Sequence, residues 1–257
     1  IDNLRKSGQA KAAKKAGRTA AEGAVLAKVS ADGKTGILVE INSETDFVAR
    51  DESFRAFAEE VAGVVLNTKV TDMASLSQQK VSTGATVEEA RSALVQKIGE
   101  NIQVRRATVL EGEDVVGAYV HSGRIGVLVA LKAGNADLAK DIAMHVAASS
   151  PLVVNSSEVS EATIAKEREI YTAQAADSGK PAEIVAKMVE GRIAKFLKEV
   201  SLVDQPFVKD PEVTVGGLAK KAGAEVRKFL RFDVGEGIEK EEKDFAAEVM
   251  AQVRGNN

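Results

Sequence analysis

The chain contains an internal repeat that constrains its fold more than any other feature. Residues 23–39 form two apolar stretches joined by a glycine-containing turn, and residues 117–129 repeat this pattern. Such a pattern is typical of a β-hairpin. Each copy is followed by a segment with apolar residues at helical spacing, residues 53–66 and 136–149. The sequence therefore predicts an α+β fold with a duplicated β-β-α core.

Further elements complete the two units. The helical spacing of residues 87–98 ends at Gly99, a residue suited to the left-handed cap of a helix. A predicted strand at 102–110 follows it, and a second one at 225–234 should complete the other antiparallel sheet. The apolar stripes expected to pack on the sheets are Phe54, Phe57, Ala58 and Val61 in the first copy and Leu138, Ile142, Val146 and Ala147 in the second.

The pattern changes after Pro151 to two long helical stretches, residues 159–176 and 181–200. Four residues, Asp177 to Lys180, join them, and Pro181 suits a first helical turn. The second stretch has apolar residues at the alternating spacing of a coiled coil. We therefore expect an antiparallel helical hairpin inserted between segments of the second unit.

The expected organisation has five parts. They are a linking helix at 1–19, core subdomain N at 20–112, core subdomain C at 113–153 and 203–237, the inserted hairpin at 154–202, and a C-terminal module at 238–257 with a last helix at 243–253.

Composition excludes several classes of protein. The 257 residues are 44% hydrophobic, enough for a sizeable core, yet no apolar run is long enough to span a bilayer and no basic-apolar leader opens the chain. There is no cysteine, so disulfides and thiolate chemistry are excluded. We expect a cytoplasmic protein without membrane contact.

Catalytic motifs are missing as well. Gly33-Lys34-Thr35 resembles the end of a phosphate-binding loop, but Lys28 stands where that motif needs glycine. The two histidines, His121 and His145, have no cysteine beside them and form no convincing catalytic or zinc pair. We expect neither enzymatic activity nor a cofactor.

A series of short motifs runs through the chain in a fixed order. One is Thr45-Asp46-Phe47-Val48-Ala49, and the others are residues 4–8, 11–17, 97–102, 126–129, 145–149, 205–208 and 232–239. Together they resemble the bacterial elongation factor Ts family over nearly the whole chain. In that family a small helical domain precedes the point at which this chain starts, so the resemblance implies that this domain is lacking here.

The resemblance implies a guanine nucleotide exchange factor that binds elongation factor Tu and promotes GDP release. Asp46 and Phe47 match the family's wedge, which enters the GTPase domain and disturbs its magnesium site. Ile98, Gly99 and His121 match further contacts with that domain.

Two more positions match contacts elsewhere. Val208 matches a contact with the distal domain of elongation factor Tu, and Phe245 lies in the C-terminal module that also docks on the GTPase domain. An exposed aromatic in a loop suits such a role, because aromatic side chains are frequent anchors of interfaces.

Simpler interpretations of the same residues stay open. Phe47 precedes a predicted helix, where a hydrophobic staple packed under the helix is the usual role. Ile98 fits a buried helix residue and Gly99 a cap without further function, whereas His121, beside a turn, fits a core position poorly. His145, on an apolar stripe, is expected to be a core or half-buried histidine.

The alternative function is an RNA-associated scaffold, such as a host subunit of a viral RNA replicase. The chain carries a formal net charge of -3, but basic residues crowd its start. No aromatic residue is interleaved with them to stack on bases, and alanines make this segment a good helix. Nucleic acid binding is therefore not expected.

Overall fold

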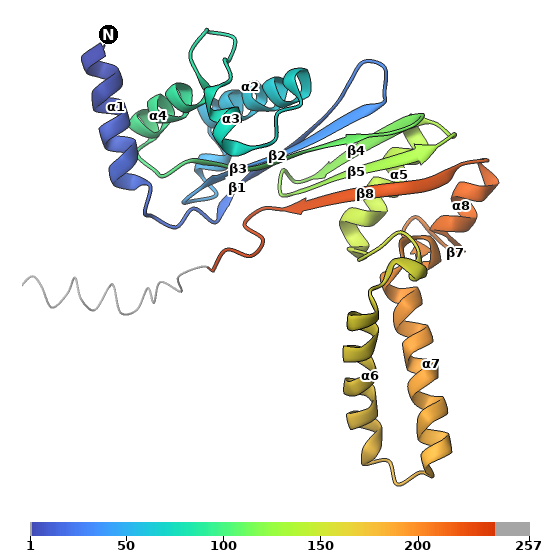
Figure 1. The fold of residues 1–257 in the computed structure, drawn as a ribbon. Coiled ribbons are helices and arrows are strands. Elements are labelled where there is room, and N and C mark those ends of the chain that lie inside the picture. Colours follow the sequence, from blue (N-terminus) through green and yellow to red (C-terminus); the bar gives the residue numbers. More distant parts are fainter. Residues whose placement is uncertain (1, 240–257) are drawn as a thin grey trace, which may run out of the picture.

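Two three-stranded antiparallel sheets form the centre of the molecule (Figure 1). The structure is a computed structural model that describes residues 2–239, with side chains from Gln9 onward. The first sheet has the order β1-β2-β3 and the second the order β4-β5-β8. Their strands are β1 Glu22–Val29, β2 Thr35–Ser43, β3 Gln103–Glu111, β4 Val115–His121, β5 Ile125–Lys132 and β8 Glu225–Asp233. The predicted α+β class is confirmed.

Helices α2 (Glu52–Thr68) and α4 (Val87–Ile98) cover the outer face of the first sheet, where α3 (Met73–Gln78) and α1 (Asp2–Lys15) contact α4. The Asp51 carboxylate caps α2 by accepting two backbone N–H groups, and Thr86 forms a capping box at α4. The whole predicted stripe of α2 is buried, from Phe54 to Val61.

Helix α5 (Ala136–Ser149) covers the outer face of the second sheet. Its stripe is buried as predicted, with Leu138, Ile142, Val146 and Ala147 all in one apolar cluster with the sheet. The inner faces of the two sheets contact each other. The body of the protein is therefore a stack of helices, sheet, sheet and helix.

The two sheets approach each other at a pair of equivalent glycines. A Cβ atom on Gly36 would lie 2.9 Å from a methyl carbon of Leu128, and one on Gly126 would lie 3.1 Å from a methyl carbon of Leu38. Gly36-Leu38 and Gly126-Leu128 occupy the same places in the two copies of the repeat. The copies thus pack reciprocally, each leucine filling the space over the other copy's glycine, and a larger side chain at either glycine would push the sheets apart.

The predicted equivalence of the first strands is wrong in detail. Gly117 pairs with Val129, whereas Gly23 pairs with Asn42, several positions further along β2. The two glycines also serve different purposes. A Cβ at Gly117 would lie 2.4 Å from Cβ of Ala139 in α5, while one at Gly23, with φ of 137°, would lie 2.1 Å from the Ile41 carbonyl oxygen.

Helices α6 (Glu161–Ala176) and α7 (Ala182–Val200) form the predicted hairpin, which projects away from the sheets (Figure 1). Its apolar seam contains the buried residues Ala175, Val189 and Ile193. The seam does not cover every apolar residue of the second predicted stretch, which includes Ile184, because Ile184 is 47% exposed. Short elements frame the hairpin and lead back to β8, namely η2 (Ser156–Glu158), η3 (Leu202–Asp204), β6 (Pro206–Phe207), β7 (Asp210–Thr214) and α8 (Val215–Lys221).

Two expectations concern the ends and the membrane. The predicted last helix and Phe245 lie outside the described residues. Within residues 2–239, no helix combines the length and the apolar character needed to cross a membrane.

Candidate functional site

Phe47 is the most exposed large hydrophobic residue in the part of the chain that the structure describes, at 78%. It lies between β2 and the short helix η1 (Val48–Arg50), at the N-cap of η1. The staple interpretation is therefore wrong, and the physical reason lies in the next residue. Val48 turns inward and packs in the first core, which leaves Phe47 pointing to solvent.

The backbone before Phe47 is held by the carboxylate of Glu100. Oε2 of Glu100 accepts the backbone N–H groups of Glu44 and Thr45 at 3.1 and 3.0 Å, and Oε1 accepts the Thr45 hydroxyl at 2.8 Å. In return, Oε1 of Glu44 accepts the backbone N–H of Asn101 at 2.6 Å. The two segments hold each other through charge-assisted hydrogen bonds, which are the stronger kind.

Asp46 takes part in a weaker contact at the surface. Its Oδ2 lies 2.9 Å from Nη2 of Arg50, one turn further on. Both side chains are about half or more exposed, so solvent screens the pair and its contribution to stability is about 1 kcal/mol or less. The carboxylate of Asp46 therefore remains accessible to a partner.

Ile98 and Gly99 end helix α4 directly before Glu100. Ile98 is partly buried against the first core, and Gly99 has a φ of 91° and donates its N–H to the carbonyl oxygen of Val95. The predicted left-handed cap is thereby confirmed. Lys15 Nζ donates a hydrogen bond to the Gly99 carbonyl oxygen. The structure thus brings the end of α4 beside the Phe47 loop, as the Glu100 contacts require.

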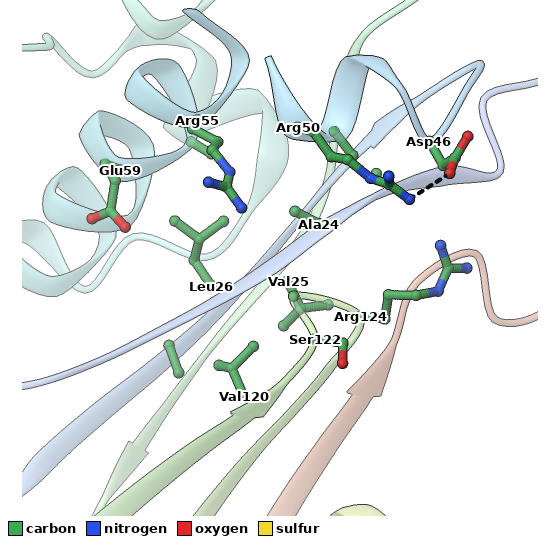
Figure 2. Close-up of a pocket in the computed structure, with 15 residues that line it drawn as sticks. Ala24, Val25, Leu26, Asp46, Arg50, Arg55, Glu59, Val120, Ser122 and Arg124 are labelled. Atoms are coloured by element: carbon green, nitrogen blue, oxygen red, sulfur yellow. Dashed lines mark hydrogen bonds and ion pairs between the residues drawn. The ribbon is translucent and has the colours of Figure 1, made fainter. Parts of the chain in front are cut away.

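A groove of about 670 Å³ opens next to Asp46 (Figure 2). Its floor is apolar and comes largely from β1, while Arg50, Arg55 and Arg124 stand around it. The β4–β5 turn forms the other side, and the carbonyl oxygen of Gly123 in this turn accepts the N–H of Val25 at 2.8 Å. The turn of the second sheet is thus joined to the edge of the first.

His121 directly precedes this turn and is exposed. Its Nδ1 lies 3.1 Å from the Tyr119 hydroxyl, which is enough to orient the ring without burying it. Asp46 and the 122–124 turn line one groove, so His121 directly precedes a turn that shares this groove with the Phe47 loop.

Val208 lies in the β6–β7 hairpin, beside helix α5 on the outer side of the second sheet. Its backbone N–H bonds to Nδ1 of His145 in α5, and β7 lies near the root of the helical hairpin, away from the first sheet (Figure 1). Val208 is 46% exposed. The structure therefore groups Asp46, Phe47, Ile98, Gly99 and His121, and separates Val208 from them.

A buried histidine holds the segment that presents Val208. His145 is fully buried, its Nε2 lies 2.9 Å from Oε1 of Gln205, and its Nδ1 accepts the N–H of Val208 at 3.1 Å. These partners select the neutral tautomer with hydrogen on Nε2. Burial lowers the pKa of His145, and the bond to Gln205 offsets this only in part. The prediction of a core histidine is confirmed.

Sequence reasoning missed a buried charged cluster around Glu40. This residue is fully buried in β2, where its carboxylate contacts Arg105 at 3.1 Å and Arg106 at 2.5 Å on the neighbouring strand β3. It also accepts the Asn42 side-chain N–H at 2.9 Å and the Gly235 backbone N–H at 2.8 Å. Burial raises the pKa of Glu40, but these hydrogen bonds and the Arg106 charge outweigh it and hold the pKa below its ordinary value.

The cluster fixes the chain where it leaves β8. Arg106 donates to the Asp233 carbonyl oxygen at 3.0 Å and contacts the Glu236 carboxylate at 3.2 Å. Gly235 has a φ of 74° and lies so close to Ala21 that a Cβ would meet its carbonyl oxygen at 2.2 Å. A glutamate within the apolar run of residues 37–41 was the sequence signal for this cluster.

Comparison with known proteins decides the family. The model of the family described as Elongation factor TS matches residues 44–236, a range that includes the Phe47 loop. The chain belongs to the elongation factor Ts family. The resemblance expected from the motifs is confirmed, and with it a role in translation elongation.

Curated elongation factor Ts proteins match over nearly their whole length. That of Alcanivorax borkumensis is 63% identical over 255 residues, which cover 99% of this chain and 90% of the relative. That of Hahella chejuensis is 61% identical over 256 residues and that of Legionella pneumophila 58% identical over 254, each covering 99% of this chain and 87% of the relative.

Proposed function

We propose that this protein is a guanine nucleotide exchange factor that binds elongation factor Tu and promotes the release of GDP during translation elongation. The observation that carries the proposal is the exposed Phe47 at the end of a braced loop, in a chain of the elongation factor Ts family. Aromatic residues make up only 4% of the chain, and an exposed aromatic side chain in a loop is a frequent anchor of an interface.

Exchange needs no chemistry from the factor itself, and we propose that the protein is not an enzyme in the sense of making or breaking bonds. A factor that binds the nucleotide-free partner more tightly than the nucleotide-bound one lowers the partner's affinity for nucleotide by the same ratio. Differential binding by a rigid surface is sufficient for this effect.

The proposed wedge is the pair Asp46 and Phe47. Phe47 would enter between helices of the GTPase domain of elongation factor Tu and disturb the groups that support its Mg²⁺ ion. Because Mg²⁺ neutralises the charge of the bound diphosphate, a loss of that support weakens GDP binding without direct competition for the nucleotide pocket. A loop fixed before binding loses less conformational entropy in the complex.

The other proposed contacts with elongation factor Tu lie on two surfaces of the protein. Ile98, Gly99 and His121 would contact the GTPase domain beside the wedge, which agrees with their position near the Phe47 loop. Val208, beside α5 and away from the first sheet, would contact the distal domain. Phe245 and the C-terminal module would return to the GTPase domain. Contacts at two separate surfaces of the protein would orient the wedge.

The direct test is a nucleotide release assay. Elongation factor Tu carrying a fluorescent GDP analogue is mixed with excess unlabelled GDP, with and without the protein, and the fluorescence decay is followed. We expect the protein to accelerate release in a concentration-dependent manner. Release at the intrinsic rate with saturating protein would contradict the proposal.

A further inference from the structure

The proposed function requires the Phe47 loop to project in one direction, and the structure shows which side chain fixes that direction. We propose that Glu100 is a positioning residue for nucleotide exchange, which acts by holding the backbone of the Phe47 loop rather than by touching the partner's nucleotide site. This inference rests on the proposed function and adds to it a residue outside the wedge.

The contacts of Glu100 are concentrated on the start of the loop. One oxygen accepts two consecutive backbone N–H groups, those of Glu44 and Thr45, and the other accepts the Thr45 hydroxyl. Two consecutive N–H groups that converge on one carboxylate oxygen fix the orientation of the peptide planes between them. Phe47 follows two residues later, so a rotation of these planes would redirect its ring.

The backbone that carries Glu100 is held by the residues on either side of it. Gly99, in its left-handed cap, ends α4 directly before Glu100, and Ile102, fully buried, follows closely after it. Between them, Asn101 is 2% exposed, donates its backbone N–H to Glu44 and donates its side-chain N–H to the Arg18 carbonyl oxygen at 2.7 Å. Glu100 therefore links the Phe47 loop to a segment of backbone that is anchored in the first core.

The core does not depend on this brace. Ile41 anchors the end of β2 and Ile102 the chain after α4, and both side chains are fully buried in the apolar cluster of the first core. Removal of the carboxylate should release the loop while the sheet and helices remain folded. The expected defect is one of loop geometry, which distinguishes positioning from general stability.

The chain offers a matched control in Glu60. Its carboxylate likewise accepts a backbone N–H and a hydroxyl, both from Ser82, at 2.9 and 2.7 Å. It braces a loop of the same half of the molecule, but not the Phe47 loop. Glu60→Ala removes a similar set of hydrogen bonds and should leave the exchange rate unchanged.

The experiment compares variants of the full chain in the release assay with elongation factor Tu and fluorescent GDP. Glu100→Ala should lower kcat/KM for exchange by about tenfold, since small misplacements of a positioned group have large effects on rate. Glu100→Gln retains an oxygen for the two N–H groups and an amide that can bond to the Thr45 hydroxyl, so it should restore most of the rate. Wild-type exchange by Glu100→Ala would overturn the inference.

Two readouts separate this inference from the proposed function. Hydrogen exchange of the Glu44 and Thr45 amides should accelerate in Glu100→Ala. Unchanged exchange of these amides would contradict the claim that Glu100 holds the loop backbone. Phe47→Ala and the double variant Phe47→Ala/Glu100→Ala should exchange equally slowly, because Glu100 acts through Phe47. A wild-type rate of nucleotide exchange in Phe47→Ala would refute the proposed wedge. A low rate in Phe47→Ala together with a wild-type rate in Glu100→Ala would refute only the positioning role of Glu100.

Discussion

Oε1 of Glu40 accepts the backbone N–H of Gly235 at 2.8 Å, across a sequence separation of 195 residues. The contact joins the middle of the first sheet to the chain that leaves the second sheet. Because Arg106 contacts both the Glu40 carboxylate and Glu236, the cluster also fixes the chain at residue 236, after the end of β8. A buried carboxylate is thus a polar connection between the two sheets, in addition to the apolar packing of their inner faces.

Glu40→Ala should lower the free energy of unfolding by about 3 kcal/mol, because it leaves two arginines and the Gly235 N–H without their partner. The value lies at the lower end of the range for broken buried pairs, since both arginine side chains are partly exposed and can reach water. Denaturant unfolding would measure it.

Glu111→Ala is the control, because its carboxylate pairs with Lys69 at the surface and should contribute about 1 kcal/mol or less. Equal losses in the two variants would contradict a structural role for the Glu40 cluster.

The stability of the protein should fall as the pH drops below 6.5, the ordinary value for histidine, and His145 is the reason. The folded state holds this pKa low, so below pH 6.5 the unfolded state binds a proton that the folded state does not bind. The free energy of unfolding should then decrease by at most about 1.4 kcal/mol per pH unit. Unfolding curves between pH 5 and 8 measure it.

His145→Gln should be less stable at every pH but should lose this slope between pH 5 and 6.5. His121→Gln, which replaces the exposed histidine, should retain the slope. A slope that survives in His145→Gln would assign the proton uptake to another group.

The architecture could be predicted well from the repeat because each copy shows local residue patterns typical of strands, turns and helices. Two-residue alternation, helical spacing and glycine turns identified both hairpins, α2, α4, α5 and the return of β8 to the second sheet. The short elements α3 and α8 and the β6–β7 hairpin escaped prediction, since segments of two to seven residues carry too little periodicity.

The candidate site was less predictable because its geometry depends on long-range contacts. A phenylalanine between a strand and a helix has the same local sequence whether it is a staple or an exposed anchor. Only the burial of Val48 and the contacts of Glu100, 55 residues beyond Thr45, decide between them. The motif indicated which residue was unusual, and tertiary structure determined its direction.

Removal of the helical hairpin should leave the core folded and exchange within about twofold of the wild-type rate, because its seam is largely satisfied by its own pairing. The deletion must retain the residues at the base of the hairpin, because they pack in the second core. Leu202 is fully buried in the second core and its N–H bonds to the Val153 carbonyl oxygen, so residues 161–198 are the segment to replace with a short Gly/Ser linker.

Circular dichroism and the release assay test this on one preparation. A folded deletion variant without exchange activity would show that the hairpin belongs to the functional surface.

Binding of this protein and GDP to elongation factor Tu should oppose each other by the same factor, as linkage requires. Saturating GDP with Mg²⁺ should therefore weaken the complex in proportion to the loss of GDP affinity that the protein causes. Calorimetric titrations with and without nucleotide measure both sides of this cycle. Equal affinities under the two conditions would exclude an exchange role.

Phe47→Ala should slow exchange strongly and leave stability almost unchanged. The ring is 78% exposed in the free protein, so its removal should change the free energy of unfolding by about 0.5 kcal/mol or less, far below the 3–5 kcal/mol typical of a buried phenylalanine. In the complex the ring is the proposed anchor, whose truncation typically costs 2 kcal/mol or more, about a thirtyfold loss in kcat/KM.

Leu152→Ala is the matched control for this prediction, since Leu152 is 62% exposed and lies near the root of the hairpin, outside the proposed contacts. It should show the same small change in melting temperature and no change in exchange. Thermal melts and GDP release on the same preparations separate the outcomes. A Phe47→Ala protein that melts several degrees lower would indicate a structural role for the ring, and one that melts and exchanges like wild type would refute the wedge.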